Sequence, residues 1–166
     1  SCARSWASIP TPLASIRPCA AEVDRIFLDA NVLFSAAYRK DAGVRKIWGA
    51  TAAAVLLTSA YAVEEARRNL DTAERRSNLD ELLETVHVSN ALVDPAQHPE
   101  IGVSGLPDKD LPIMRAAVAA KATRLLTGDR KHFGHLFGEK VAGVLIMRPA
   151  DHPATSASSI PDEANE

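Results

Sequence analysis

The chain has 166 residues, of which 46% are hydrophobic and 24% charged, and its formal net charge is −2 at pH 7. This length and composition are those of one globular domain with a sizeable core, and no apolar run approaches the roughly 20 residues that a membrane span needs. The near-neutral charge excludes a polybasic protein that holds nucleic acid by charge alone, but it does not exclude an enzyme that meets nucleic acid through a local patch.

Both ends of the chain differ in composition from its centre. Residues 1–24 contain three prolines among Ser, Thr and Ala, and these prolines interrupt every stretch that could serve as a secretory signal. Residues 150–166 combine Pro, Ser, Ala and acids without periodicity. We therefore expect a flexible N-terminal extension over 1–24, one domain over 25–149 and a disordered tail over 150–166. Cys2 and Cys19 fit neither a disulfide framework nor a zinc site, so a reducing, cytoplasmic setting is the simpler interpretation.

Between these ends, short apolar runs alternate with segments of helical periodicity. In chain order the pattern predicts strand 25–28, helices 31–38 and 43–53, strand 55–58, helices 60–70 and 72–85, strand 86–88, loop 90–109, helix 110–122, and strands 124–127 and 141–147. Ser59 is a good N-cap for the helix that follows it. Strands that alternate with helices indicate βαβ units, so we expect an α/β fold with three layers, in which helices cover both faces of a mainly parallel sheet.

Four acidic residues are expected at one edge of this sheet. Asp29 directly follows the first predicted strand and Asp129 follows the fourth. Glu65 lies on the helix after the second strand, and Asp110 stands at the head of the helix before the fourth. Functional groups in parallel sheets collect beyond the carboxyl ends of the strands. Four carboxylates at this edge would repel one another unless a cation compensates their charge.

Oxygen ligands of this kind suit Mg²⁺ or Mn²⁺ rather than zinc. Ions held by carboxylates can activate water and stabilise the leaving oxygen of a phosphodiester, so the predicted chemistry is hydrolysis of a nucleic-acid backbone. Each acid alone also has a structural interpretation: Asp29 and Asp129 could form turns, Asp110 could cap its helix, and Glu65 could be a solvated surface residue. The prediction therefore depends on the arrangement of all four.

The same residues carry a resemblance to a known family. From about residue 25 to 149, the chain resembles the PIN-domain nucleases and, in size, the bacterial VapC-like toxins and their relatives. The matching segments occur in the family's order on the expected elements, and they are 27–33 (FLDANVL), 58–70, 108–117 and 125–129 (LLTGD).

The resemblance implies a PIN-like fold and an endoribonuclease that hydrolyses phosphodiester bonds of RNA with one or two Mg²⁺ or Mn²⁺ ions. It assigns both metal binding and catalysis to four acids, namely Asp29, Glu65, Asp110 and Asp129. Glu65 is preferred to Glu64 because a small residue, Ala66, follows it. Nothing in the residues themselves distinguishes RNA from DNA.

Other residues receive supporting roles from the resemblance. Asn31 and Thr127 would orient carboxylates or water by hydrogen bonds, and Asp108 would be a substitute ligand or a helper outside the site. Weaker candidates for contacts with substrate phosphates are Arg130, Lys131 and Arg68. His132 could serve as a general base, but a metal ion would already supply the nucleophile, so this role is discounted.

The resemblance also implies partners. A small antitoxin protein would insert a segment over the acidic site, and a homodimer would use the apolar helices around Phe34, Ile47 and Trp48, unless these side chains belong to the core. Two other functions remain open. A non-catalytic PIN-like binding or assembly module would have lost one or more of the acids, and a haloacid-dehalogenase-like phosphatase would need a second aspartate where this chain has Asn31.

Overall fold

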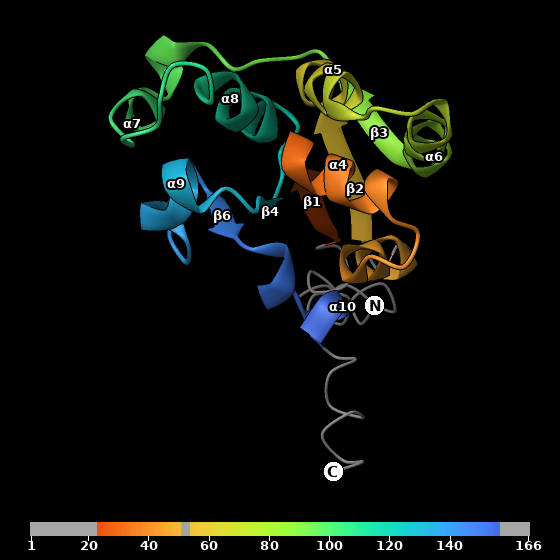
Figure 1. Ribbon diagram of the computed structural model, residues 1–166. Coiled ribbons are helices and arrows are strands. Elements are labelled where there is room, and N and C mark those ends of the chain that lie inside the picture. Colours follow the sequence, from red (N-terminus) through yellow and green to blue (C-terminus); the bar gives the residue numbers. More distant parts are fainter. Residues whose placement is uncertain (1–22, 51–53, 157–166) are drawn as a thin grey trace, which may run out of the picture.

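The structure, a computed structural model, describes residues 23–50 and 54–156. In this part of the chain, six strands form one sheet in the order β3-β2-β1-β4-β6-β5 (Figure 1). The strands are β1 (Asp24–Leu28), β2 (Ala54–Ser59), β3 (Val86–Ser89), β4 (Arg124–Leu126), β5 (Lys140–Val141) and β6 (Val144–Met147). Neighbouring strands are parallel except β5 and β6, so the predicted α/β fold with a mainly parallel sheet is confirmed.

The helices begin where the sequence supplies capping side chains. The side chain of Ser59 accepts a hydrogen bond from the Ala62 amide, and Thr72 does the same for Arg75, which satisfies amides that a helix leaves free in its first turn. The α-helices are α4 (Ala30–Tyr38), α5 (Ala60–Asn69), α6 (Ala73–Leu83), α7 (Pro99–Gly102), α8 (Leu111–Ala119), α9 (Arg130–Phe133) and α10 (Pro153–Ser156). The 3-10 helices are η1 (Gly43–Ala50), η2 (Pro95–Gln97), η3 (Gly134–Leu136) and η4 (Pro149–Asp151).

The strand order divides the helices between the two faces of the sheet. From β1 the chain steps outward to β2 and β3, and it then returns across the sheet to β4 on the other side of β1. Because crossovers between parallel strands are right-handed, α4, α5 and α6 cover one face and α8 covers the other. In agreement, α4 packs against both α5 and α6, and α8 contacts β2.

The core lies between the sheet and these helices. Ile26, Phe27 and Leu28 are all fully buried, as are Leu125 and Leu126. A strand that is covered on both faces buries every side chain, which explains why these strands are continuous apolar runs rather than alternating ones.

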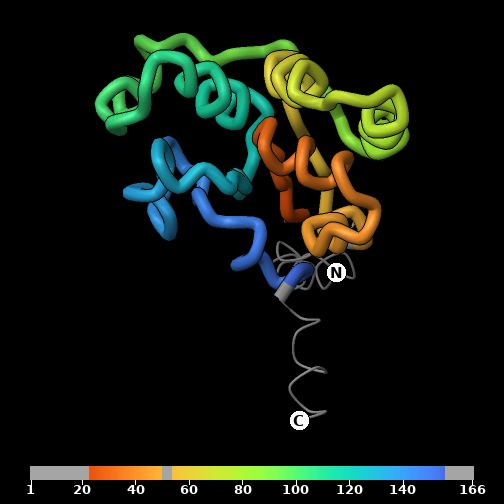
Figure 2. The backbone as a smooth tube through the Cα atoms, in the orientation of Figure 1, coloured from red at the N-terminus to blue at the C-terminus, as the bar shows by residue number. Residues whose placement is uncertain are grey.

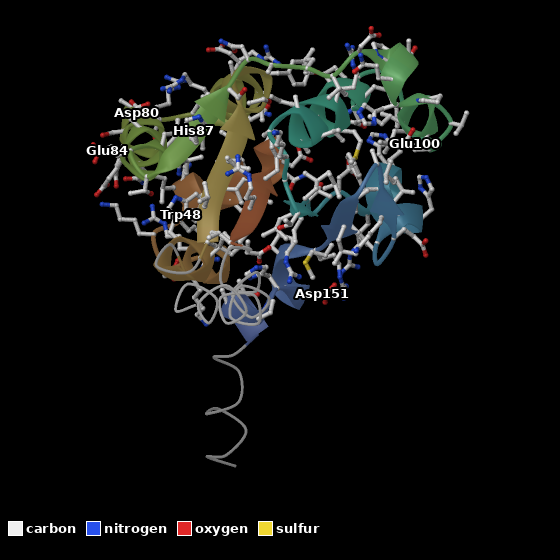
Figure 3. The ribbon with its side chains drawn as sticks, turned by 180° about the vertical axis from the view of Figure 1, so that it is seen from behind. Trp48, Asp80, Glu84, His87, Glu100 and Asp151 are labelled. Atoms are coloured by element: carbon white, nitrogen blue, oxygen red, sulfur yellow. The ribbon has the colours of Figure 1, made fainter. Side chains whose placement is uncertain are left out.

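The apolar side chains considered for a dimer contact divide between the core and its margin. Ile47 is fully buried and therefore belongs to the core. Trp48 is half-buried, and its indole N–H donates to the carbonyl of Leu82 at 3.1 Å, which ties η1 to α6 (Figure 3). Phe34 is also half-buried and packs against Tyr38 with ring centroids 5.2 Å apart.

One predicted strand is in fact two. Residues 141–147 were expected as a single strand, but Val141 pairs with Val144 across a two-residue turn that joins β5 to β6. Ala142 and Gly143 both have positive φ, at 51° and 86°, as a tight hairpin turn of this kind requires. An alanine in the first turn position is why the sequence shows no turn signal there.

Two further segments are more ordered than expected. The predicted loop over 90–109 contains the short helices η2 and α7. Beyond residue 149, where a disordered tail was predicted, η4 and α10 follow. His152 is buried, and α10 lies against η1, which is about 100 residues earlier in the chain (Figure 2).

Residues 1–22 and 157–166 lie outside the described residues, so the proposed extension, tail and domain limits stay predictions. No helix within the described ranges is long and apolar enough to cross a membrane.

Candidate metal centre

The predicted acids lie where the sheet topology favours a binding site. The chain leaves β1 toward one side of the sheet and β4 lies on the other side, so a crevice opens between the carboxyl ends of these neighbouring strands. Asp29 follows β1 directly, and Asp129 is the third residue after the end of β4. The two aspartates therefore flank this crevice.

An open cavity of about 1170 Å³ occupies the crevice. Its lining includes all four predicted acids, which come from four separate segments of the chain: Asp29, Glu65, Asp110 and Asp129. Asn31 also lines it. The arrangement concentrates negative charge around one solvent-accessible space.

Asp29 is the most deeply placed of the four, with 6% of its surface exposed. It is the N-cap of α4, and its Oδ1 accepts from the Ala30 amide at 2.7 Å. Burial raises the pKa of Asp29 to about 6, against the lowering effect of hydrogen bonds from Thr127 and Ala30, and the charges of Glu65 and Asp110 raise it further. The folded chain therefore holds a carboxylate whose charge is poorly compensated by the protein alone.

Thr127 ties the two aspartates of the crevice together. Its fully buried hydroxyl donates to Asp29 Oδ2 at 2.8 Å and accepts from the Asp129 amide at 3.2 Å. It also accepts from Asn31 Nδ2 at 3.1 Å. The hydroxyl thus uses its donor and both its acceptor positions.

Asn31 completes this network. Its Nδ2 lies 3.3 Å from Asp29 Oδ2, and its Oδ1 accepts from the Gly128 amide at 2.8 Å. The side chain therefore connects the start of α4 to the loop after β4. Asn31 and Thr127 are placed to hold Asp29 and Asp129 in fixed positions.

Asp110 and Asp129 face one another across His132. The Nδ1 atom of His132 lies 2.8 Å from Asp129 Oδ2 and 3.0 Å from Asp110 Oδ2. Burial acts to raise the pKa of Asp129, but hydrogen bonds from the backbone amide and ring of His132, together with its charge, outweigh that effect and lower the pKa. Asp110 precedes α8 and makes no side-chain capping bond to it, so helix capping does not explain its position.

Cationic side chains stand around the same cavity. Lys109, Arg130 and Arg148 line it, and Arg148 also makes two hydrogen bonds to Asp151, at 2.8 and 2.9 Å. The remaining charged candidates from the sequence do not line the cavity and are exposed: Asp108, Lys131 and Arg68. Two of the lining cations, Lys109 and Arg148, were not singled out by the sequence.

The donor set fits a hard divalent cation. Asp110 Oδ2 is buried and has no hydrogen-bond partner within the described residues, although His132 Nδ1 lies 3.0 Å from it. A buried carboxylate oxygen without a hydrogen bond is costly unless a cation neutralises it. The carboxylates around the cavity are oxygen ligands of the type that Mg²⁺ and Mn²⁺ prefer. The potential ligand atoms of Asp110, Asp129 and His132 all lie within 4.8 Å of one another.

His132 is the functional candidate that the sequence undervalued. From the sequence it was considered as a general base, a role that was discounted. Its contact with Asp110 spans 22 positions in the sequence and depends on where the residue before α8 lies relative to α9, so no local pattern predicts it. The one available signal was the i, i+3 spacing from Asp129, which puts both side chains on the same side of a helical turn.

No protein-family model matches the sequence, and no curated protein matches it either. Among solved structures, the chain is similar to VapBC2 from Rickettsia felis, determined bound to a DNA fragment from their promoter. That match covers 75% of this chain and 98% of that chain, with 16% sequence identity and a TM-score of 0.57. FitAcB from Neisseria gonorrhoeae also matches, over 76% of this chain and 99% of that chain, with 20% identity and a TM-score of 0.47.

At 16% identity, the similarity to the VapBC2 chain concerns the fold alone. The mainly parallel sheet agrees with the architecture expected from the sequence, and the match covers nearly all of the VapBC2 chain. The predicted PIN-like α/β fold is therefore confirmed.

Proposed function

We propose that this protein is a divalent-metal-dependent endoribonuclease whose active site is the acidic cavity at the carboxyl ends of β1 and β4. The observation that carries the proposal is the convergence of four carboxylates from separate segments on one open cavity. Local turns and caps account for some of these acids one at a time, but they do not account for all four meeting in one place.

The metal would be held by Asp29, Glu65, Asp110 and Asp129, as Mg²⁺ or Mn²⁺. When bound, such an ion supplies Lewis acidity to the phosphodiester and lowers the pKa of water for attack on phosphorus. The lowered pKa of Asp129 keeps that side chain charged at neutral pH, ready to bind a cation. Thr127 and Asn31 position the two aspartates that follow β1 and β4.

The rest of the cavity suits a flexible polynucleotide. Lys109, Arg130 and Arg148 offer positive charge for backbone phosphates at the rim of an acidic site. Phe34 and Val44 add an apolar part of the lining, against which an unpaired base can rest. RNA, rather than DNA, is proposed on the resemblance to PIN-domain ribonucleases.

The proposed partners rest on resemblance as well. The similar chain belongs to VapBC2, which was solved bound to a DNA fragment from their promoter. We infer that this protein is the toxin of a toxin–antitoxin pair, that a small antitoxin covers the acidic cavity, and that the toxin can form a homodimer.

Cleavage of a mixed pool of single-stranded RNA tests the proposed activity. We expect cleavage with Mg²⁺ or Mn²⁺, none with EDTA, and recovery when the metal is restored. Asp129→Asn should slow cleavage by roughly a hundredfold, because one carboxylate of the site is lost.

The matched control is Asp108→Asn, which changes an exposed aspartate outside the cavity on the loop before α8. This variant should cleave as the unmodified protein does. If Asp129→Asn also cleaves as the unmodified protein does, the cavity is not the active site. A folded protein that binds the RNA pool but cleaves none of it with either metal would favour a non-catalytic binding module.

A further inference from the structure

His132 occupies an unusual position between two acids of the cavity. Its side chain is 21% exposed, and that of Asp110 is 13% exposed. The backbone amide of His132 donates to Asp129 Oδ1 at 3.1 Å, which turns Asp129 Oδ2 toward the imidazole ring. The Nδ1 atom consequently faces one oxygen from each aspartate, at 2.8 Å and 3.0 Å.

The protein alone satisfies only part of this arrangement. The Nδ1 position can carry one proton, and its hydrogen bond goes to Asp129 Oδ2. Asp110 Oδ2 is left buried without a hydrogen-bond partner among the residues that the structure describes. If Nδ1 carries no proton, three lone-pair donors face one another, and such a group needs a cation to hold it together.

The distances agree with a shared cation. Two ligands in adjacent positions of an octahedron, each about 2.1 Å from the ion, are roughly 3 Å apart. The separations of Nδ1 from the two carboxylate oxygens have this length. The ligand atoms of His132 and both aspartates all lie within 4.8 Å of one another, so a single ion can contact all three.

We propose that the Nδ1 atom of His132 is a ligand of the metal, together with Asp110 and Asp129, and that this ligand makes the site prefer Mn²⁺ to Mg²⁺. The inference rests on the proposed metal-dependent function and refines it. Carboxylates alone bind Mg²⁺ well, whereas an imidazole nitrogen favours transition metals. The sequence resemblance assigns only acids to the metal site, so the nitrogen ligand comes from the structure.

Titration calorimetry of the full chain with each metal alone tests this preference. The variant His132→Asn places an amide oxygen near the position of Nδ1, and so exchanges a nitrogen donor for an oxygen donor. We expect it to keep its affinity for Mg²⁺ within a few-fold and to lose at least about tenfold in affinity for Mn²⁺. Removing even a residue that only hydrogen-bonds to a metal ligand typically lowers metal affinity by about tenfold or more. His132→Ala should weaken binding of both ions.

The matched control is His87→Asn. His87 is exposed on the edge strand β3, and Figure 3 shows it on the side of the molecule that carries α6. This variant also removes one imidazole in favour of an amide, but it leaves the cavity untouched. Its affinities for Mn²⁺ and Mg²⁺ should equal those of the unmodified protein.

Pulsed electron paramagnetic resonance of the Mn²⁺-loaded protein gives a readout that does not depend on activity. A histidine ligand couples its ¹⁴N nucleus to the manganese electrons, and we expect this coupling in the unmodified protein and in His87→Asn, but not in His132→Asn. Circular dichroism verifies that each variant is folded.

The outcomes separate the two proposals. If Mn²⁺ binds without nitrogen coupling, or if the coupling persists in His132→Asn, then His132 is not a ligand and the metal-dependent nuclease still stands. If neither ion binds the folded, unmodified protein in the calorimeter, the proposed function fails and the role of His132 fails with it.

Discussion

Replacing Asp29 with asparagine should make the metal-free protein lose less stability between pH 4.5 and pH 8, and should also reduce RNA cleavage by roughly a thousandfold, the range expected when a central charged group is removed. The two effects have one cause. Asp29 is buried at the centre of an acidic cavity, where its charge would serve to bind a cation but opposes folding when no cation is present.

The sign of the stability effect follows from the pKa of Asp29, which rises from 3.8 to about 6 on folding, mainly through burial. Between pH 4 and pH 6 the folded state therefore binds more protons than the unfolded state, so stability falls as pH rises through this window. The difference in pKa corresponds to at most about 3 kcal/mol of the free energy of unfolding. This contribution is present at low pH and is fully lost once the pH is above 6. An asparagine does not titrate and does not suffer this loss.

Urea denaturation in EDTA from pH 4.5 to pH 8 measures the effect. The difference in unfolding free energy between Asp29→Asn and the unmodified protein should shift in favour of the variant by about 2 to 3 kcal/mol across this range. Using the difference between two curves cancels the titration of groups that both proteins share. A constant difference would show that Asp29 does not carry a raised pKa.

An exposed capping aspartate is the appropriate control. Asp94 is the N-cap of η2 and accepts from the Ala96 amide at 2.9 Å on the surface. Asp94→Asn changes the same chemical group in the same capping role, but in contact with solvent, so its stability relative to the unmodified protein should vary little with pH. Adding Mn²⁺ at pH 8 should raise the stability of the unmodified protein and not that of Asp29→Asn, because only the former binds the ion tightly.

The sequence was informative where local signals determine the structure. The apolar runs that became β1 and β4 are buried on both faces, as are Leu56 and Leu57 of β2, so burial left a continuous pattern that a sequence can show. Parallel strands also share one edge for their carboxyl ends, which is why the positions of Asp29 and Asp129 after their strands sufficed to predict that they would meet.

Other features depended on contacts that no local pattern records. The turn of the β5–β6 hairpin contains Ala142 with a positive φ, and alanine is not a residue type that indicates a positive φ. The order of residues 150–156 comes from packing of α10 against η1, about 100 residues earlier. The contact between His132 and Asp110 and the raised pKa of Asp29 both arise from burial and three-dimensional proximity, which a motif cannot supply.

Replacing Thr127 with valine should destabilise the protein by about 3 kcal/mol, although valine has nearly the same shape. The hydroxyl of Thr127 makes hydrogen bonds with Asp29, Asn31 and Asp129 in a fully buried position. Its loss removes the shorter of two side-chain hydrogen bonds to Asp29 Oδ2, leaving the one from Asn31 at 3.3 Å. Bonds to charged groups contribute about 1.5–3 kcal/mol each, more than neutral ones.

The pH dependence of this cost identifies its origin. The Thr127 hydroxyl is among the interactions that lower the pKa of Asp29, so without it the pKa should rise further above its ordinary value. Thr127→Val should therefore destabilise the protein more at pH 8, where Asp29 is charged, than at pH 4.5, where it is protonated in the folded state. Urea denaturation at the two pH values measures this difference.

Thr58→Val is the matched control, because Thr58 is equally buried and lies in strand β2, one residue before its end. Its hydroxyl donates only to the Leu28 carbonyl, at 2.8 Å, so its loss should cost about 1 kcal/mol at both pH values. If the two valine variants are equally stable at pH 8, Thr127 does not hold Asp29 in its charged form. A larger, pH-dependent cost for Thr127→Val would instead mean that the buried Thr127 hydroxyl keeps the Asp29 carboxylate ionised although desolvation opposes its charge. A cation site requires such an ionised carboxylate, whereas a simple helix cap does not.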